Sequence, residues 1–111
     1  MTDFVTIAPL QAVPGNRGLR VQWNGRELAV FAAGGAAYVF DGKCPHRGAS
    51  LGEGFTEDGN LYCPMHGWCF DLETGACADH PEKSAIRYPA RIHNEQIQAR
   101  FPDKRKTDTN D

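Results

Sequence analysis

Two short segments of the sequence each place one cysteine and one histidine close together, beside a proline. The first is Cys44-Pro45-His46, and the second, after sixteen intervening residues, is Cys63-Pro64-Met65-His66. Thiolate and imidazole are ligands of zinc and of iron–sulfur centres, and such short spacings can direct both side chains of a loop at one centre. The pattern therefore predicts a chain built around a metal centre that two similar loops hold.

The order of the four residues argues against a zinc finger of the two-cysteine, two-histidine kind. That kind of finger supplies two cysteines first and two histidines later, with the histidines on a helix. Here each loop supplies one cysteine and one histidine, and the prolines beside them discourage a helix. Two such loops facing each other could let the cysteines hold one iron and the histidines another, although zinc remains chemically possible with these ligands.

The rest of the sequence predicts an all-β fold. Twelve glycines and seven prolines are scattered along the chain, and no stretch of useful length has helical periodicity. Asn24-Gly25 and Gly34-Gly35 are hairpin turn signals, and Thr74-Gly75 and 93–95 are weaker ones. The predicted strands are Phe4–Ala8, Leu19–Trp23, Glu27–Phe31, Ala36–Phe40, Leu61–Cys63, Trp68–Asp71, Ile86–Tyr88 and Gln96–Phe101.

The length of 111 residues suits one domain, which we expect to cover residues 1–101. Within it, residues 41–81 are rich in Gly, Pro, Cys and His and are predicted to form the metal-binding loops. Residues 102–111 are polar and are expected to form a mobile tail.

Charge and hydropathy exclude several classes of function. The formal net charge of −2 gives no electrostatic footprint for nucleic acid or for an anionic membrane surface. The longest uncharged apolar stretch, residues 29–40, is too short to span a bilayer. The first residues lack the basic and apolar segments of a secretory signal, so a cytoplasmic protein is expected, and cysteines in that compartment more often bind metal than form disulfides.

The two loops carry a family resemblance. Cys44-Pro45-His46-Arg47-Gly48 and Cys63-Pro64-Met65-His66-Gly67-Trp68 resemble the paired boxes of Rieske iron–sulfur proteins. The resemblance implies three stacked antiparallel sheets with one 2Fe–2S cluster at the tip of a small loop subdomain. It also implies that Cys44 and Cys63 bind the inner iron and that His46 and His66 bind the outer one.

Residues around the predicted ligands are expected to support the cluster or to form a docking rim for a redox partner. Gly48 and Gly67 follow histidine ligands and are expected to permit a turn or a close backbone approach to the cluster. The rim is predicted to contain His46, His66 and the residues beside them, namely Pro45, Arg47, Pro64, Met65 and Trp68.

Two departures from the high-potential respiratory members of the family predict a low reduction potential. Those members carry an additional cysteine in each loop, and the two form a disulfide, whereas Ala49 and Met65 stand at the matching positions here. They also carry a serine and a tyrosine whose hydroxyls donate to sulfur, and here those positions hold Trp68 and Phe70. Without these donors the more negative reduced state is less stabilised, which places the potential at the low end of roughly −150 to +300 mV.

Four further cysteines and histidines fall outside the predicted ligand set. Cys69 and Cys77 are interpreted as buried thiols that act as small apolar residues. His80 and His93 are interpreted as surface loop histidines.

Three functions fit these features. The first is a monomeric ferredoxin component that carries electrons from a flavin-dependent reductase to a terminal oxygenase and is not itself an enzyme. The second resembles the Rieske-like small subunit of an assimilatory nitrite reductase, which the segment Gly48-Ala49-Ser50-Leu51-Gly52-Glu53-Gly54 would suit equally well. The third is a zinc-stabilised binding module without a redox role.

Overall fold

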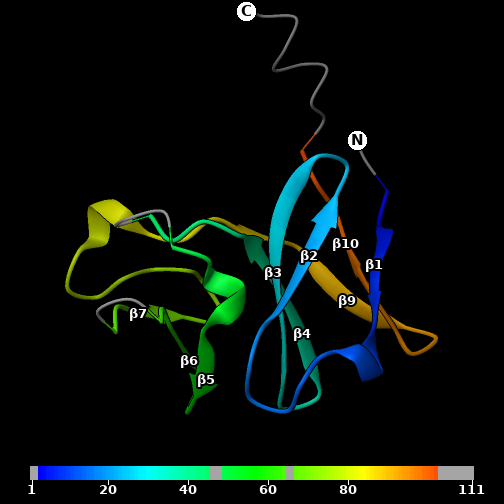
Figure 1. Ribbon diagram of the computed structural model, residues 1–111, viewed down its shortest axis with the longest axis horizontal. Helices are drawn as coiled ribbons and strands as arrows, with labels where there is room; N and C mark the ends of the chain where they lie inside the picture. The colour runs from blue at the N-terminus through cyan, green and yellow to red at the C-terminus, as the bar shows by residue number, and fades with distance from the viewer. Residues whose placement is uncertain (1–2, 46–48, 65–66, 103–111) are drawn as a thin grey trace, which may run out of the picture.

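The computed structural model describes residues 3–45, 49–64 and 67–102, and within them the chain is built from strands and three short 3-10 helices (Figure 1). The strands are β1 (Val5–Pro9), β2 (Leu19–Trp23), β3 (Arg26–Ala33), β4 (Ala36–Asp41), β5 (Phe55–Glu57), β6 (Asn60–Tyr62), β7 (Cys69–Asp71), β8 (Arg87–Tyr88), β9 (Ala90–His93) and β10 (Gln96–Ala99). The 3-10 helices are η1 (Leu10–Ala12), η2 (Leu51–Glu53) and η3 (Pro81–Lys83). In these described segments, no helix has the length and apolar character needed to cross a membrane. The all-β prediction is confirmed.

The two strongest turn signals form hairpins as predicted. Asn24 and Gly25 have φ of 53° and 83° between β2 and β3, and Gly34 and Gly35 have φ of 59° and 82° between β3 and β4. Positive φ at both central residues gives a turn whose twist matches that of the flanking strands. These hairpins join β2, β3 and β4 into one continuous meander.

Two strands, β5 and β9, were missed by the sequence prediction. Each forms one arm of a tight hairpin, whose turn residues Asp58 and Gly59, or Asn94 and Glu95, have positive φ. Asp-Gly is a strong hairpin signal, so β5 could have been inferred from the turn even though its three residues are too few to show alternation. The predicted strand 61–63 is also shifted, because β6 ends at Tyr62 and Cys63 begins the loop.

The strands form three antiparallel sheets. The outer sheet has the order β1-β10-β9, the central sheet β2-β3-β4-β8, and the loop sheet β5-β6-β7. Figure 1 shows the loop sheet on one side of the central sheet and the outer sheet on the other.

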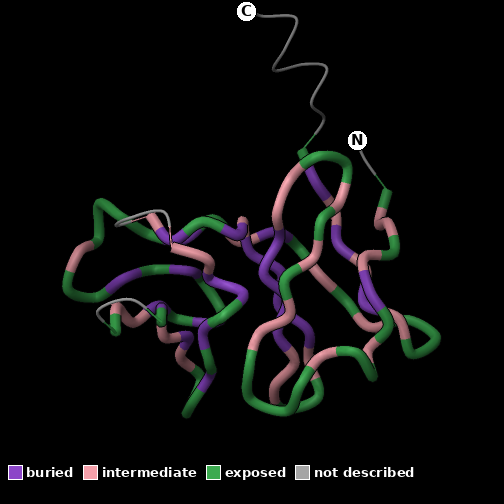
Figure 2. The backbone as a smooth tube through the Cα atoms, in the orientation of Figure 1, coloured by how far each residue is buried: buried purple, intermediate pink, exposed green. Residues whose placement is uncertain are grey.

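The two middle strands of the central sheet, β3 and β4, are buried on both faces. Leu28 and Val30 of β3 belong to the core shared with the outer sheet, whereas Ala29 and Phe31 belong to the core shared with the loop sheet. Figure 2 shows this run of buried residues through the middle of the molecule. Burial on both faces explains why the sequence of these strands is continuously apolar rather than alternating.

The loop sheet has one buried and one exposed face. Directly paired residues Thr56, Leu61 and Phe70 are buried, and the neighbouring row of Phe55, Tyr62 and Cys69 is exposed or half-buried. Two cores, one on each side of the central sheet, confirm the expected stack of three antiparallel sheets.

Candidate metal centre

The first cysteine loop begins at Cys44, three residues after Asp41, the last residue of β4. The backbone N–H of Cys44 donates to the carbonyl of Ala49 at 2.7 Å, and just outside this pair Lys43 and Ser50 form an antiparallel bridge. The two ends of the segment 44–49 are thus held together by backbone hydrogen bonding.

The second cysteine loop connects β6 and β7 in the same manner. The backbone N–H of Cys63 donates to the carbonyl of Trp68 at 2.8 Å, and just outside it Tyr62 and Cys69 are paired in the loop sheet. Both loops therefore span six residues and are closed by a hydrogen bond from a cysteine to the fifth residue after it. This match supports the interpretation of two equivalent loops.

Both loop cysteines are buried in the same core. Cys44 and Cys63 are each 1% exposed and belong to the core between the central sheet and the loop sheet. None of the four cysteines, all of which lie in the described part of the chain, forms a disulfide. Two reduced, water-excluded thiols at the first position of matched loops fit the inner half of a 2Fe–2S site, which needs two thiolates and protection from solvent.

The remaining predicted ligands, His46 and His66, lie outside the described residues, as do Arg47, Gly48 and Met65. Within 3–45, 49–64 and 67–102, no group of three or more His, Cys, Asp or Glu side chains could hold a metal ion. That result is consistent with a four-ligand site of which only two members are described. Ligation by the two histidines therefore stays a prediction.

Glycine is favoured at position 67 by the backbone conformation and not by close packing. Its φ is +67°, and a Cβ built on it would meet nothing within 4 Å. Of the two roles expected for this residue, the structure supports the turn, because left-handed φ favours glycine. Pro64 of the same loop is exposed, and Pro45 of the first loop is half-buried.

Trp68 and Phe70, whose lack of hydroxyl groups underlies the predicted low reduction potential, occupy different environments. Phe70 is fully buried in the same core as the loop cysteines. Trp68 is half-buried, packs against that core, and stacks on His80 with ring centroids 4.0 Å apart and an angle of 8° between the rings. Sequence reasoning missed this stack, because no local signal links residues twelve positions apart in irregular chain.

A charged network that the sequence did not reveal lies beside the first loop. Ser50 Oγ donates to Glu27 Oε2 at 2.6 Å, and Arg20 bridges Glu27 Oε1 at 3.2 Å and Glu53 Oε2 at 2.8 Å. The hydrogen bond from Ser50, followed by the one from Arg20, lowers the pKa of Glu27 despite partial burial. The network connects β2, β3 and η2 to Ser50, the residue directly after the first loop.

Glu27→Gln is expected to lower the free energy of unfolding by about 1 kcal/mol at pH 7, because the hydrogen bond to the carboxylate is weakened by solvent screening to the typical net contribution of one ordinary hydrogen bond. Because folding lowers the pKa of Glu27, its stabilisation is present above the unfolded pKa of about 4.5 and is lost as the pH falls through the folded pKa. The difference in unfolding temperature between Glu27→Gln and the wild type should therefore shrink on acidification. Glu57→Gln, an exposed carboxylate on β5, is the control, and a difference that grew in acid would contradict the assignment.

The predicted non-ligand cysteines and histidines are only partly as expected. Cys77 is 3% exposed in the core and His93 is exposed, as predicted, but Cys69 and His80 are half-buried. Cys69 interacts with its cross-strand neighbour Tyr62, and their hydrogen bond is the main cause that raises the pKa of Tyr62. Cys69 is therefore not the buried apolar filler that the sequence suggested.

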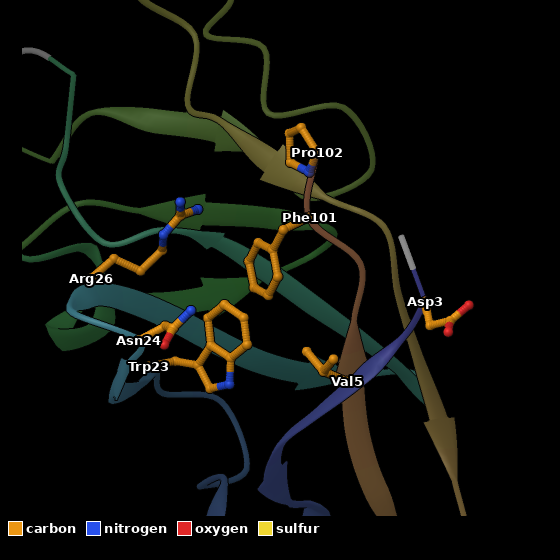
Figure 3. Close-up of a pocket in the computed structure, with 7 residues that line it drawn as sticks. All are labelled: Asp3, Val5, Trp23, Asn24, Arg26, Phe101 and Pro102. Atoms are coloured by element: carbon orange, nitrogen blue, oxygen red, sulfur yellow. The ribbon is translucent and has the colours of Figure 1, made fainter. Parts of the chain in front are cut away.

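Two hollows lie on different parts of the surface. One, of about 610 Å³, adjoins the second loop through Pro64 and carries Arg17, Arg20 and Glu53 on its walls. The other, of about 330 Å³, lies between the β2–β3 turn and the C-terminal end of the described chain (Figure 3). In it Trp23 and Phe101 stack at 4.6 Å, and Arg26 lies over the Phe101 ring, so the two aromatic rings and this guanidinium are already engaged with one another.

Comparison with known proteins agrees with the site. Residues 3–96 match the family model for the Rieske [2Fe-2S] domain. The ferredoxin component of naphthalene 1,2-dioxygenase/salicylate 5-hydroxylase systems of a Ralstonia species is 31% identical over 96 residues, which are 86% of this chain and 92% of that protein.

Two solved structures share the fold over nearly their whole length. A ferredoxin of Sphingomonas yanoikuyae B1 superimposes with a TM-score of 0.78 and 26% identity, covering 90% of this chain and 100% of that one. A chain of Mycobacterium tuberculosis described as an NADH-dependent nitrite reductase small subunit gives 0.83 and 24%, covering 93% and 98%. At that lower identity the second likeness shows the fold alone.

Proposed function

The chain belongs to the Rieske [2Fe-2S] family, and we propose that it is a one-electron carrier that passes electrons from a flavin-dependent reductase to a terminal oxygenase. Its cofactor is one Rieske-type 2Fe–2S cluster. The observation that carries the proposal is the pair of matched, hydrogen-bonded loops, each beginning with a buried cysteine. Similarity to a ferredoxin component over 92% of that protein's length supports a carrier rather than a catalytic subunit.

In this proposal, Cys44 and Cys63 bind the inner iron and His46 and His66 bind the outer iron. When bound, such a cluster supplies reversible one-electron transfer. The chain itself buries the two thiolates, fixes each loop by its closing hydrogen bond, and carries residues without a hydroxyl at positions 68 and 70. The burial of the thiolates and the lack of hydroxyl donors both favour a reduction potential at the low end of the family range.

We also propose a domain organisation and a cellular compartment for the chain. Residues 1–101 form one monomeric domain with 41–81 as its cluster-binding part, and residues 102–111 form a polar tail. The cytoplasm is the proposed compartment, and the absence of any disulfide among the four described cysteines suits its reducing conditions.

We propose that the redox partners dock on the rim around the outer ligands, formed by Pro45, Arg47, Pro64, Met65 and Trp68. The exposure of Pro64 and the recess beside it, which carries Arg17 and Arg20, support a docking face on this side of the molecule. A carrier that must release its partner quickly needs only a small face of this kind.

Purification of the tagged protein from its native host under anaerobic conditions tests the choice of partner system. Recovery of a flavin reductase or an oxygenase, and reduction of the purified protein by that reductase with NAD(P)H, is the expected result. Stable recovery in fixed stoichiometry with a sirohaem reductase subunit would replace the carrier by a nitrite reductase small subunit.

Arg47→Glu and Met65→Asp are each expected to lower kcat/KM for electron transfer to the recovered partner roughly tenfold, because a charge change at a docking rim acts mainly on association. The absorption spectrum of the cluster should be unchanged. Arg91→Glu, an exposed charge reversal on β9 of the outer sheet, is the control. Normal rates in both rim variants would place the docking face elsewhere.

A further inference from the structure

The stack between His80 and Trp68 links a distant part of the chain to the second cysteine loop. The two rings are 4.0 Å apart and nearly parallel, at 8°. We infer that His80, which lies outside the ligand set, is a positioning residue that holds the second loop closed around the cluster by stacking on Trp68. The inference rests on the bound cluster but not on which partner receives the electron.

Trp68 is the residue through which such a contact would act. Its carbonyl accepts the 2.8 Å hydrogen bond from Cys63, which closes the loop, and its side chain packs against the core that contains both loop cysteines. Gly67 before it has a positive φ, which glycine adopts readily, but glycine also leaves the backbone at this point more conformational freedom than any other residue would. A contact that fixes the indole therefore also fixes the carbonyl that receives the Cys63 hydrogen bond.

The segment that carries His80 is itself anchored. The backbone N–H of Ala85 donates to the carbonyl of Gly75 at 2.8 Å, which closes residues 75–85 into a loop. Gly75 has a φ of +82°, and a Cβ on it would lie 2.5 Å from the carbonyl oxygen of Ala85, so this closure requires glycine. His80 N–H donates to the Cys77 carbonyl at 3.2 Å, and the His80 carbonyl accepts from Lys83 at 2.8 Å. The imidazole is therefore presented to Trp68 from a closed, hydrogen-bonded loop.

The alternative is that His80 acts through the polar nitrogens of its imidazole rather than through the face of its ring. Its side chain is 45% exposed, and its Nδ1 lies 4.0 Å from Glu82 Oε2, with Asp79 and Lys83 also nearby in sequence. A substitution that keeps a planar ring but removes the ring nitrogens separates the two possibilities.

The test uses the purified holoprotein and measures the rate at which visible absorbance is lost in the presence of an iron chelator. His80→Ala is expected to lose the cluster roughly two to ten times faster than the wild type, the ratio that corresponds to one aromatic pair. His80→Phe is expected to restore the wild-type rate. His93→Ala, an exposed histidine on β9, is the control and should change nothing.

The midpoint potential of the cluster is a second measurement. General destabilisation of the fold would not shift it in a defined direction, whereas loosening of the second loop would. Loosening the loop admits water to the cluster and stabilises the more negative reduced state, so His80→Ala should raise the potential and His80→Phe should restore it. If His80→Ala does not accumulate as a folded protein, His80→Leu, which fills the space but cannot stack, is read in the same way.

A wild-type rate and potential in His80→Ala would overturn the inference while leaving the carrier function intact. Failure of His80→Phe to restore either quantity would also overturn it, because a polar contact of the imidazole nitrogens, rather than the stack, would then hold the loop. Loss of the cluster signal in the wild-type protein itself would instead count against the proposed function.

Discussion

Cys63→Ser is expected to reduce the iron content of the purified protein from about two atoms per chain, the content of a 2Fe–2S cluster, to near zero. The structure places this thiol at the start of a closed loop and buries it to 1% exposure in the core that also contains Cys44. A serine hydroxyl has a far higher pKa than a thiol and binds iron poorly as a neutral group, so the inner iron would lose half of its protein ligands. Cys44→Ser should have the same effect.

Cys77→Ser is the matched control for this experiment. Cys77 is 3% exposed in the same core, so the substitution introduces a hydroxyl into a comparable buried environment. The control separates a ligand role from general destabilisation, since both variants bury a new polar group but only one removes a proposed ligand. Iron, labile sulfide and zinc are measured together, along with the electron-spin resonance signal of the reduced protein.

Three outcomes of that measurement have different meanings. Loss of iron in Cys63→Ser and Cys44→Ser but not in Cys77→Ser supports the proposed inner ligands. Equal loss of iron in all three variants would mean that a buried hydroxyl destabilises the core, and it would not support a ligand role for Cys44 or Cys63. A colourless wild-type protein with stoichiometric zinc would exclude both redox functions, because zinc has no accessible redox change.

The all-β class and the meander β2–β3–β4 were predictable because their signals are local. Asn24-Gly25 and Gly34-Gly35 dictate tight hairpins through their backbone conformations, and the apolar residues between them match a strand buried on both faces. Strand β5 could not be inferred from its own composition, since three residues show no periodicity. Only the Asp58-Gly59 turn that follows it indicated a hairpin at this position.

The candidate site was predictable to the extent that it depends on spacing along the chain. Cysteine and histidine positions within each loop are local, and the shared closure of the two loops agrees with them. Contacts between distant segments were not predictable. Neither the packing of His80 on Trp68 nor the bond from Ser50 to Glu27 leaves a trace in the sequence, because both depend on how separate segments of the chain pack together.

The substitution Trp68→Ser with Phe70→Tyr is expected to raise the midpoint potential of the cluster by roughly 130 to 250 mV. Each added hydroxyl offers one hydrogen bond to a negatively charged sulfur, and such bonds contribute roughly 1.5–3 kcal/mol. For a one-electron couple, about 1.4 kcal/mol corresponds to about 59 mV. Because the reduced cluster is the more negative state, a donor stabilises it more than the oxidised state, which raises the potential.

The single substitutions should contribute unequally, and the structure indicates why. Phe70 is fully buried in the core that holds Cys44 and Cys63, so a tyrosine hydroxyl there would be shielded from water and would form its bond in a medium of low dielectric constant. Trp68 is only half-buried, and its replacement also removes the stack on His80. Phe70→Tyr should therefore shift the potential with little loss of cluster stability, whereas Trp68→Ser should combine a shift with faster cluster loss.

Protein-film voltammetry on the wild type, both single variants and the double variant measures the shift directly. Phe31→Tyr is the control, because Phe31 is buried in the same core but is carried by β3 of the central sheet rather than by the loop sheet that carries residue 70. An unchanged potential in Phe70→Tyr, with the cluster intact, would show that missing hydroxyl donors do not set the low potential. The potential would then have to be controlled by other groups around the cluster, and the argument from positions 68 and 70 would fail.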